Sequence, residues 1–326
     1  MTSPPAATTM TDVLNIACLS GGDTRGAFQA GALDGLTRAG ILFHGYIGTS
    51  TGALHGGFLS QADGTLEGQA AQIGRLEEIW FGLRDRSDIL GGGLLSGIIR
   101  ALTFRPSLTT LAPLAGLLER HIVEPPTVPV WLGVVSLETG LFRSWRPGSV
   151  GELRTAILAS ASTPVVLEPV SAEGLVDGGV REISPLAAAF EHARELKRPG
   201  QRVRIWLIQG FPMSRITRPV RPGIDWRKRP LWQVALRTLQ IANHETMKDD
   251  EEHALRINEL VAIFERHPEL SRPAWLRDRI HADVVRIECS GEDAPYDMFE
   301  VKPDLIRHAW RRGVQRGSAA AGEVLR

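Results

Sequence analysis

The sequence predicts a three-layer α/β/α fold with a mainly parallel central sheet and helical additions toward the C-terminus. Through the first 60 residues, short apolar runs alternate with segments of helical periodicity. Both of the first two junctions from strand to helix are glycine-rich turns, and the alternation returns between residues 128 and 209. Such alternation is typical of parallel strands covered by helices. With 326 residues, 43% of them hydrophobic, the chain is long enough to bury a core of this kind.

Composition excludes several classes of protein. The 37 basic and 37 acidic residues balance, so we expect no nucleic-acid partner. The two cysteines, Cys18 and Cys289, lie in apolar strand patterns and are expected to be inert core thiols rather than a disulfide scaffold. No segment offers the ~18 consecutive apolar residues of a membrane-spanning helix, and no signal-peptide pattern begins the chain. We expect a soluble, cytoplasmic protein, with peripheral membrane contact and signal-independent secretion left open.

The first 60 residues are expected to form two strand–turn–helix units. An apolar run ends at Ser20, Gly21 and Gly22, and apolar residues then recur at spacings of three and four until Gly40. A second apolar run enters a second glycine turn, and small residues follow it. The expected order is strand 14–19, helix 25–39, strand 43–47 and helix 53–61.

Further elements follow the same patterns along the chain. Residues 89–99 are apolar and glycine-rich, and they are expected to form either a buried helix with a loop or a lid that contacts an acyl chain. The other expected elements are helix 65–84, helix 108–121, strand 128–135, a strand within 140–145, helix 152–161, strand 175–176, helix 185–197, strand 202–209, helices 231–246 and 249–266, strand 284–289 and helix 302–317.

The domain organisation follows from this pattern. Residues 1–12 are expected to be a disordered leader, because they are small, polar and almost uncharged. Residues 13–190 are expected to hold the catalytic core, and residues 191–326 to add strands and helices that complete the same domain.

The sharpest local signal is the G-x-S-x-G pentapeptide formed by Gly48, Thr49, Ser50, Thr51 and Gly52. An apolar strand precedes it and a helix of small residues follows it. Such a turn strains the serine backbone and exposes the hydroxyl near a helix N-terminus, where negative charge is favoured. Ser50 is therefore the candidate nucleophile.

A serine nucleophile also needs donors for the oxyanion and a base. The 20–26 loop lies between a strand and a helix start, so its backbone N–H groups can converge on one anion. The base candidate is Asp177, which follows a short strand and precedes Gly178 and Gly179, so that it can approach another loop closely.

Other readings of these segments fail. Asp23 stands where a G-x-G-x-x-G dinucleotide fingerprint needs glycine, and Lys248 stands where H-E-x-x-H needs its second histidine, so residues 243–253 are expected to be a charged, solvated helix face. No histidine is a clear base: His55 is expected on a helix and pointing away from Ser50. The remaining candidates are expected in polar, exposed contexts: His44, His121, His192, His267, His281 and His308.

With these motifs together, the chain resembles the patatin-like phospholipase family over about residues 14–190. The residues that carry the resemblance are 20–31, 48–54 and 177–179, together with the segment 159–164 (A-S-A-S-T-P). The resemblance implies the patatin-like α/β/α fold and lipid acyl hydrolysis by a Ser–Asp dyad. It implies Ser50 as nucleophile and Asp177 as base, and an oxyanion hole formed by the loop residues Gly21, Gly22, Asp23, Thr24, Arg25 and Gly26.

One residue departs from the family pattern. The loop usually reads G-G-G in this family, and Asp23 replaces the third glycine. If that position has a positive φ, aspartate tolerates it better than most residues do. Its carboxylate is unfavourable near a developing oxyanion, so the quality of the hole is the open point.

The expected function is phospholipase A or lysophospholipase-type hydrolysis of carboxylic esters through an acyl-enzyme on Ser50, without metal or cofactor. A transacylase with the same acyl-enzyme and a catalytically weak lipid-binding protein are the alternatives. The substrate is a lipid or another acyl ester. The arginine-rich stretch 215–237, with interleaved tryptophans, is expected either to contact anionic membrane surfaces or to be a solvated loop.

Overall fold

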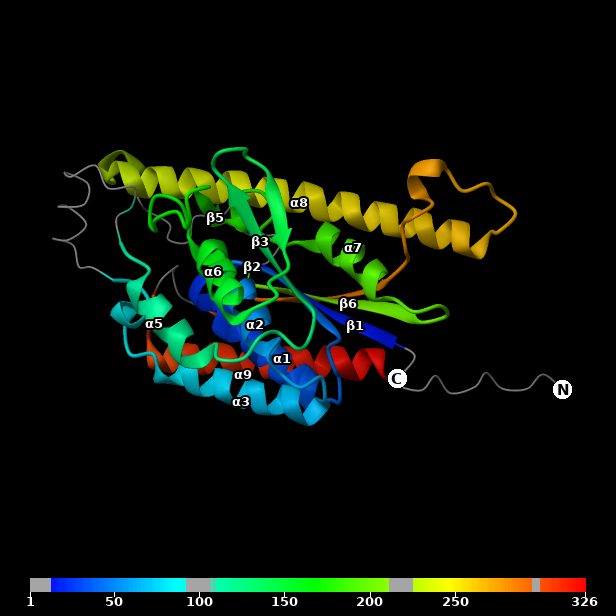
Figure 1. Ribbon diagram of the computed structural model, residues 1–326, viewed down its shortest axis with the longest axis horizontal. Helices are drawn as coiled ribbons and strands as arrows, with labels where there is room; N and C mark the ends of the chain where they lie inside the picture. The colour runs from blue at the N-terminus through cyan, green and yellow to red at the C-terminus, as the bar shows by residue number, and fades with distance from the viewer. Residues whose placement is uncertain (1–12, 92–106, 108, 211–224, 295–299) are drawn as a thin grey trace.

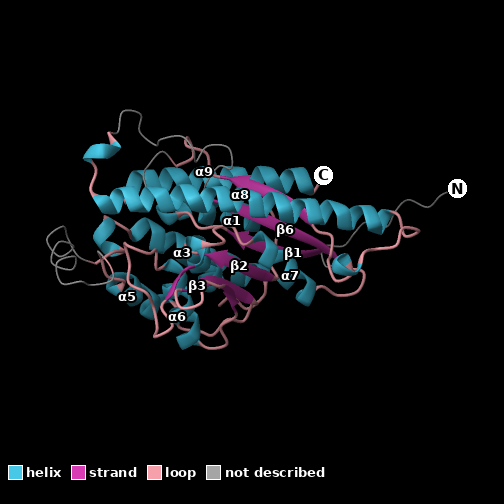
Figure 2. Ribbon diagram, turned by 90° about the horizontal axis from the view of Figure 1, so that it is seen from above, coloured by secondary structure: helices cyan, strands magenta, loops and turns pink. Residues whose placement is uncertain are grey.

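A twisted, mainly parallel sheet forms the centre of the molecule. The computed structural model describes residues 13–91, 107, 109–210, 225–294 and 300–326. Seven strands pair in the order β4-β3-β2-β1-β6-β7, with β5 added to the edge of β3, and Figure 2 shows β6, β1, β2 and β3 side by side. The strands are β1 (Val13–Leu19), β2 (Gly45–Thr49), β3 (Val130–Ser136), β4 (Phe142–Trp145), β5 (Leu175–Asp177), β6 (Arg202–Gln209) and β7 (Asp283–Glu288).

Helices cover both faces of this sheet (Figure 1). Two of them, α7 (Leu186–Leu196) and α8 (Leu231–Arg266), pack on one face. The opposite face carries α1 (Gly26–Arg38), α2 (Thr51–Leu59), α3 (Leu66–Gly82), α5 (Ala112–His121), α6 (Val150–Ala161) and α9 (Pro303–Val324). The predicted α/β/α arrangement with a mainly parallel sheet is therefore confirmed.

Strand β1 illustrates why the central strands read as continuous apolar runs. Its alternate residues Ile16 and Cys18 face the α7 side, whereas Ala17 and Leu19 face the α1 side. Since helices cover both faces, neither set meets water, and the polar alternation of a half-exposed strand is absent. Both cysteines are buried, as expected.

The C-terminal helix α9 lies directly against α1. Glycines on both helices allow the close approach: a Cβ on Gly31 would collide with the Trp310 carbonyl, and one on Gly313 with the Phe28 carbonyl. Strands β6 and β7 extend the sheet beside β1. The chain beyond residue 190 thus continues the sheet and the helical layer of the preceding part.

One long helix replaces two expected ones. Residues 231–246 and 249–266 belong to the single helix α8, because Met247 and Lys248, the two residues between them, both favour a helix and no glycine or proline interrupts it. The expectation of a fully solvated face also fails at Glu251, which is buried and accepts hydrogen bonds from Gln209 at 2.6 Å and Arg286 at 3.1 Å.

Several boundaries also differ from the expected ones, for local reasons. Strand β2 begins at Gly45 rather than Phe43, because the Phe43 N–H donates to the Gln69 side chain at 2.8 Å. Helix α5 begins at Ala112, since the Thr109 N–H pairs instead with the Val166 carbonyl at 2.9 Å. Helix α9 continues to Val324, seven residues past the expected end at 317.

Some expectations concern segments outside the described residues. These are the leader 1–12, residues 92–99 of the apolar glycine-rich stretch, and residues 215–224 of the basic stretch. Within the described ranges, no helix combines the length and apolar character needed to cross a membrane.

Candidate active site

Ser50 occupies a strained turn between β2 and α2. Its backbone has φ 56° and ψ −122°, a conformation that residues other than glycine rarely adopt. Gly48 and Gly52 permit the turn, because a Cβ on Gly48 would collide with the Gly52 backbone and one on Gly52 with the Leu19 carbonyl. The expected sharp strand-to-helix turn is therefore present, with Ser50 at its apex and at the N-terminus of α2.

Ser160, near the end of α6, ties this turn to the sheet. The Ser50 N–H donates to the Ser160 hydroxyl at 2.9 Å, and that hydroxyl donates to the Gly133 carbonyl of β3 at 2.6 Å. Sequence reasoning noted Ser160 only as part of the 159–164 segment and assigned it no role. Its contacts lie 110 and 27 residues away along the chain, so no local pattern could have revealed them.

The register of β3 brings Asp177 to Ser50. Thr49, the last residue of β2, pairs with Gly133, and Asp177 of β5 pairs with the next residue, Val134. Strand β5 therefore occupies the edge of β3 at the point where β2 ends. Since Ser50 leaves the sheet at that same point, the two side chains meet although 127 positions separate their numbers.

Hydrogen bonds hold the Asp177 carboxyl from several sides. The Gly179 N–H donates to Oδ1 at 2.8 Å, and the Thr163 hydroxyl donates to Oδ2 at 3.2 Å. Burial raises the pKa of Asp177 to about 6, although the hydrogen bonds from Gly179, Ser50 and Thr163 oppose this effect. A carboxyl with this pKa is ionised at neutral pH and is a stronger base than an exposed aspartate.

The 20–26 loop lies beside Ser50, but several of its amides are already engaged. The Gly21 N–H donates to the Ile183 carbonyl at 2.8 Å, and the Arg25 N–H donates to the Gly22 carbonyl at 3.0 Å. The Gly26 N–H is directed at the Asp23 and Thr24 carbonyls. Within the described part of the chain, the amides of Gly22 and Asp23 donate to no protein acceptor.

Asp23, which replaces the third glycine of the family's loop, has a positive φ of 49°. Its carbonyl accepts a hydrogen bond from the Thr51 hydroxyl at 2.9 Å, which joins the loop to the first turn of α2. Burial, and then the nearby Asp177 carboxylate, raise the pKa of Asp23 to about 7, while Arg25 lowers it. Two carboxyls with raised pKa values thus stand close together beside Ser50.

Ser50 opens into a small, mainly apolar pocket of about 70 Å³. Its apolar wall consists of Leu54, Trp80, Ile89, Leu90, Leu114, Ala161, Leu167 and Val301, and its polar residues besides Ser50 are Asp23, Thr24, Thr51, Arg86 and Thr163. Ile89 and Leu90 begin the apolar stretch 89–99, for which contact with an acyl chain was one of the two expectations. These two residues line the pocket beside Ser50.

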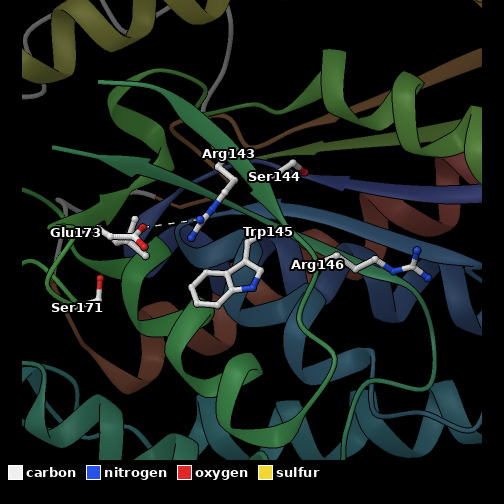
Figure 3. A pocket seen from close by; sticks show the side chains of 7 residues that line it. Arg143, Ser144, Trp145, Arg146, Ser171 and Glu173 are labelled. Carbon is white, nitrogen blue, oxygen red and sulfur yellow. Dashed lines mark ion pairs between the residues drawn. The ribbon is translucent and has the colours of Figure 1, made fainter. Parts of the chain in front are cut away.

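A second, more open cavity of about 470 Å³ lies along β4 (Figure 3). Arg143 is turned toward Glu173, with 3.8 Å between the paired atoms, and its guanidinium lies 5.0 Å from the centre of the Trp145 ring. Arg146 points away from this pair in Figure 3. Ser144 also lines this cavity, and its hydroxyl lies 2.9 Å from Nε2 of the buried His192. Ser144 stands within strand β4 rather than on a strained strand–helix turn, so we assign the candidate chemistry to Ser50.

The histidines near these elements have structural partners. His55 is buried, and its ring nitrogens bond Gln29 and Trp80 at 2.8 and 3.1 Å. His192 was expected to be exposed but is buried, because it stacks on Trp131 with 4.2 Å between ring centres. In the described ranges, no cluster of three or more histidine, cysteine, aspartate or glutamate residues could hold a metal ion.

The fold and the site together define a class: an α/β protein whose serine, on a strained strand–helix turn, faces a buried carboxyl beside an apolar pocket. A family model described as patatin-like phospholipase matches residues 17–190, more than half of the chain. The chain therefore belongs to the patatin-like phospholipase family, whose activity in general is lipid acyl hydrolysis.

The other comparisons add little beyond this family. The crystal structure of VipD from Legionella pneumophila is similar over 96% of this chain and 67% of that chain, at 10% sequence identity and a TM-score of 0.37. The comparison with curated proteins gave no match.

Proposed function

We propose that the protein hydrolyses carboxylic esters of lipids, in the manner of a phospholipase A or lysophospholipase, through an acyl-enzyme on Ser50. The observation that carries this proposal is the pairing of Asp177 with Val134 directly beyond the Thr49–Gly133 pair. That register puts a carboxyl with a raised pKa at the serine hydroxyl. Family membership supports the lipid substrate.

The proposed reaction has two steps that share one base. As the Ser50 oxygen attacks the ester carbonyl, Asp177 accepts the hydroxyl proton, and it returns that proton to the alkoxide that leaves. A water molecule then gives a proton to Asp177 and attacks the acyl-enzyme, which releases the fatty acid and restores Ser50. Thr163 and the Gly179 amide keep the carboxylate oriented throughout.

The oxyanion donors are proposed to be fewer than the six loop residues that the sequence suggested. Gly21, Arg25 and Gly26 contribute their amides to other bonds, and Thr24 also has an interaction partner. We therefore assign the oxyanion to the amides of Gly22 and Asp23, beside the N-terminus of α2. A single donor of this kind is worth roughly 3 kcal/mol of transition-state stabilisation. The pocket around Leu54 and Leu114 would take the start of the acyl chain.

Active-site labelling and ester hydrolysis test this proposal together. We expect a fluorophosphonate probe to label Ser50, and we expect Ser50→Ala and Asp177→Asn to lower the turnover of a p-nitrophenyl acyl ester by about a hundredfold or more. The matched control is Ser60→Ala, since Ser60 is a buried serine just after α2 whose hydroxyl donates to the Gly57 carbonyl at 2.7 Å. Full activity in Asp177→Asn would refute the dyad.

Asp23 favours one alternative, a catalytically weak lipid-binding protein, because a second carboxyl beside the oxyanion position opposes the charge that develops there. Absence of labelling at Ser50 across the pH range, together with binding of a fatty acid, would support that reading. Transacylation would instead appear in product analysis, as acyl transfer to an added alcohol at the expense of free fatty acid.

We also propose peripheral contact with anionic lipid through the described end of the basic stretch. Trp226 is 38% exposed, and the side chains of Arg227 and Lys228 lie mostly in solvent while pairing with Asp225. Each such cation adds about 1 kcal/mol near an anionic surface. Co-sedimentation with vesicles of rising anionic content tests this contact, and binding that is indifferent to lipid charge would refute it.

A further inference from the structure

A buried chain of hydrogen bonds connects the pocket wall to the 20–26 loop. It starts at Trp80 of α3, passes through His55 of α2 and ends at Gln29 of α1. Trp80 lines the same pocket as Ser50, and all three side chains are at least nine-tenths buried. Three helices that meet around the candidate site are therefore joined by polar contacts in an otherwise apolar layer.

The chemistry of these groups fixes the direction of every bond. The Trp80 indole N–H can only donate, so His55 Nε2, at 3.1 Å, must accept. In the neutral ring the proton then resides on Nδ1, which donates to Gln29 Oε1 at 2.8 Å. The Gln29 amide is thereby oriented with its NH₂ group toward the sheet, and only one tautomer of His55 satisfies all partners.

Gln29, the last residue of this chain of hydrogen bonds, binds the backbone where two neighbouring strands end. Gln29 Nε2 donates to the carbonyl of Ser20 at 3.1 Å and to that of Ile208 at 2.9 Å. Ser20 is the first residue after β1 and begins the 20–26 loop, and Ile208 lies at the end of the neighbouring strand β6. Gln29 thus clamps the position at which the backbone leaves β1 toward Gly22 and Asp23.

The packing around His55 leaves little room for another arrangement. A Cβ on Gly26 would collide with Thr51 and would lie 2.8 Å from Trp80 and 3.1 Å from His55. The start of α1, the start of α2 and the Trp80 ring are therefore in mutual contact. Any rotation of the imidazole would be transmitted both to Gln29 and to the turn that carries Ser50.

We propose that His55 is a positioning residue, which through Gln29 holds the 20–26 loop in the geometry that presents the Gly22 and Asp23 amides to the oxyanion. This inference rests on the proposed hydrolase function. His55 takes no part in proton transfer: burial lowers its pKa to about 3, so the ring stays neutral at any pH at which the protein would act. Trp80 fixes the orientation of the His55 ring through its hydrogen bond to Nε2.

Two amide substitutions separate the two hydrogen bonds of His55, one to Gln29 and the other to Trp80. The amide nitrogen of asparagine lies near the position of Nδ1, so His55→Asn keeps the donor to Gln29 and loses the acceptor for Trp80. His55→Gln places its amide near Nε2, keeps an acceptor for Trp80 and loses the bond to Gln29. We expect His55→Gln to lower kcat about ten- to a hundredfold through the misplaced loop while KM changes little. His55→Asn is expected to stay closer to the wild type.

His192→Gln is the matched control, because His192 is also buried and bonded through both ring nitrogens, to Ser144 at 2.9 Å and Glu195 at 3.2 Å, but lies on the opposite face of the sheet. We expect it to reduce thermal stability without the fall in kcat. A second check is Trp80→Phe, which removes the hydrogen bond from the Trp80 indole to His55. Its effect on kcat is expected to vanish in a protein that already carries His55→Asn, because that substitution has removed the same bond.

Nuclear magnetic resonance supplies a readout that does not depend on activity. We expect the His55 ring to show the neutral Nδ1–H tautomer with no titration between pH 5 and pH 8, where an ordinary histidine titrates. We also expect His55→Gln, but not His192→Gln, to shift the amide resonances of Gly22 and Asp23. Equal losses in the Asn and Gln variants, a change in KM alone, or unmoved loop amides would each overturn the proposal. A wild-type protein without esterase activity, but with these shifts, would overturn the proposed function and leave the positioning intact.

Discussion

Replacing Asp23 with asparagine removes the second carboxyl from beside Ser50, and we expect this to abolish the alkaline limb of the pH–rate profile. Asp177, the proposed base, must be ionised for the proposed reaction, and burial raises its pKa to about 6, so we expect the rate to rise through that pH. Burial and the Asp177 carboxylate raise the pKa of Asp23 to about 7, so above this pH we expect its anion to oppose the negative charge of the proposed oxyanion. The wild type is therefore expected to have a narrow optimum between these two values.

The size of the alkaline fall follows from charge repulsion. For a separation of roughly 6 Å and an effective dielectric constant of about 20, two unit charges repel each other by about 3 kcal/mol, which is roughly a hundredfold in rate. Arg25 partly offsets the Asp23 charge, and Arg86 faces the same pocket, so the expected fall is at most about a hundredfold. Asparagine tolerates the positive φ of 49° and keeps the backbone amide that we assign to the oxyanion.

The assay is the pH dependence of kcat/KM on a p-nitrophenyl acyl ester, for the wild type and Asp23→Asn. We expect the acid limb near pH 6 to remain, because Asp177 owes its raised pKa first to burial and not to Asp23. A variant that still loses activity above about pH 7 would assign that limb to another group and refute the reasoning. An acid limb that moves with the substitution would show that Asp177 is not the base.

Further predictions concern stability. Burial raises the pKa of Asp177 from 3.8 to about 6, so native stability is expected to fall as the pH rises through this window. In denaturant unfolding, we expect Asp177→Asn to gain about 2 kcal/mol on the wild type between pH 4 and pH 7, and a constant difference would contradict this. Ser160→Ala leaves the Ser50 N–H and the Gly133 carbonyl without their partner, and we expect it to lower the unfolding free energy by about 1–3 kcal/mol. We also expect kcat to fall, and an unchanged kcat would contradict this prediction. Val165 has a positive φ of 74°, so Val165→Asn is expected to stabilise the protein by about 1 kcal/mol, and a lower melting temperature would refute the strain argument.

Local turn chemistry made Ser50 and Asp177 predictable from the sequence. The glycines at 48 and 52 are required by backbone contacts that a Cβ would prevent, within the turn for Gly48 and against Leu19 of β1 for Gly52, so they mark the turn in the sequence. Gly178 is required in the same way, since a Cβ there would collide with the Gly133 carbonyl. Each of these glycines lies within two residues of Ser50 or Asp177, so a short sequence pattern records it, although the backbone that Gly52 and Gly178 approach, at Leu19 and Gly133, is distant along the chain.

The oxyanion loop shows where that range ends. The sequence predicted a glycine-rich loop that the structure places beside Ser50, but it could not tell which amides remain available, because the Gly21 N–H donates to the Ile183 carbonyl, 162 positions further along the chain. The division of α8 into two helices failed for a related reason. Met247, near the expected break, is buried, and tertiary packing carries the helix through a charged segment that has little apolar pattern of its own.

The raised pKa values of Asp177 and Asp23 both follow from where the fold places these two carboxyls. Asp177 is buried because β5 continues the edge of β3 where β2 stops, so the same register that brings it to Ser50 also withdraws it from water. The raised pKa of Asp23 comes first from its own burial and then from the Asp177 carboxylate, so the family departure in the loop changes the electrostatics around the proposed base without changing the fold. A glycine at this position would leave one carboxyl to titrate beside the serine. With aspartate there, the 20–26 loop and the proposed base carry two carboxyls of raised pKa, so the pH dependence that we expect depends on this residue as well as on the Ser–Asp geometry.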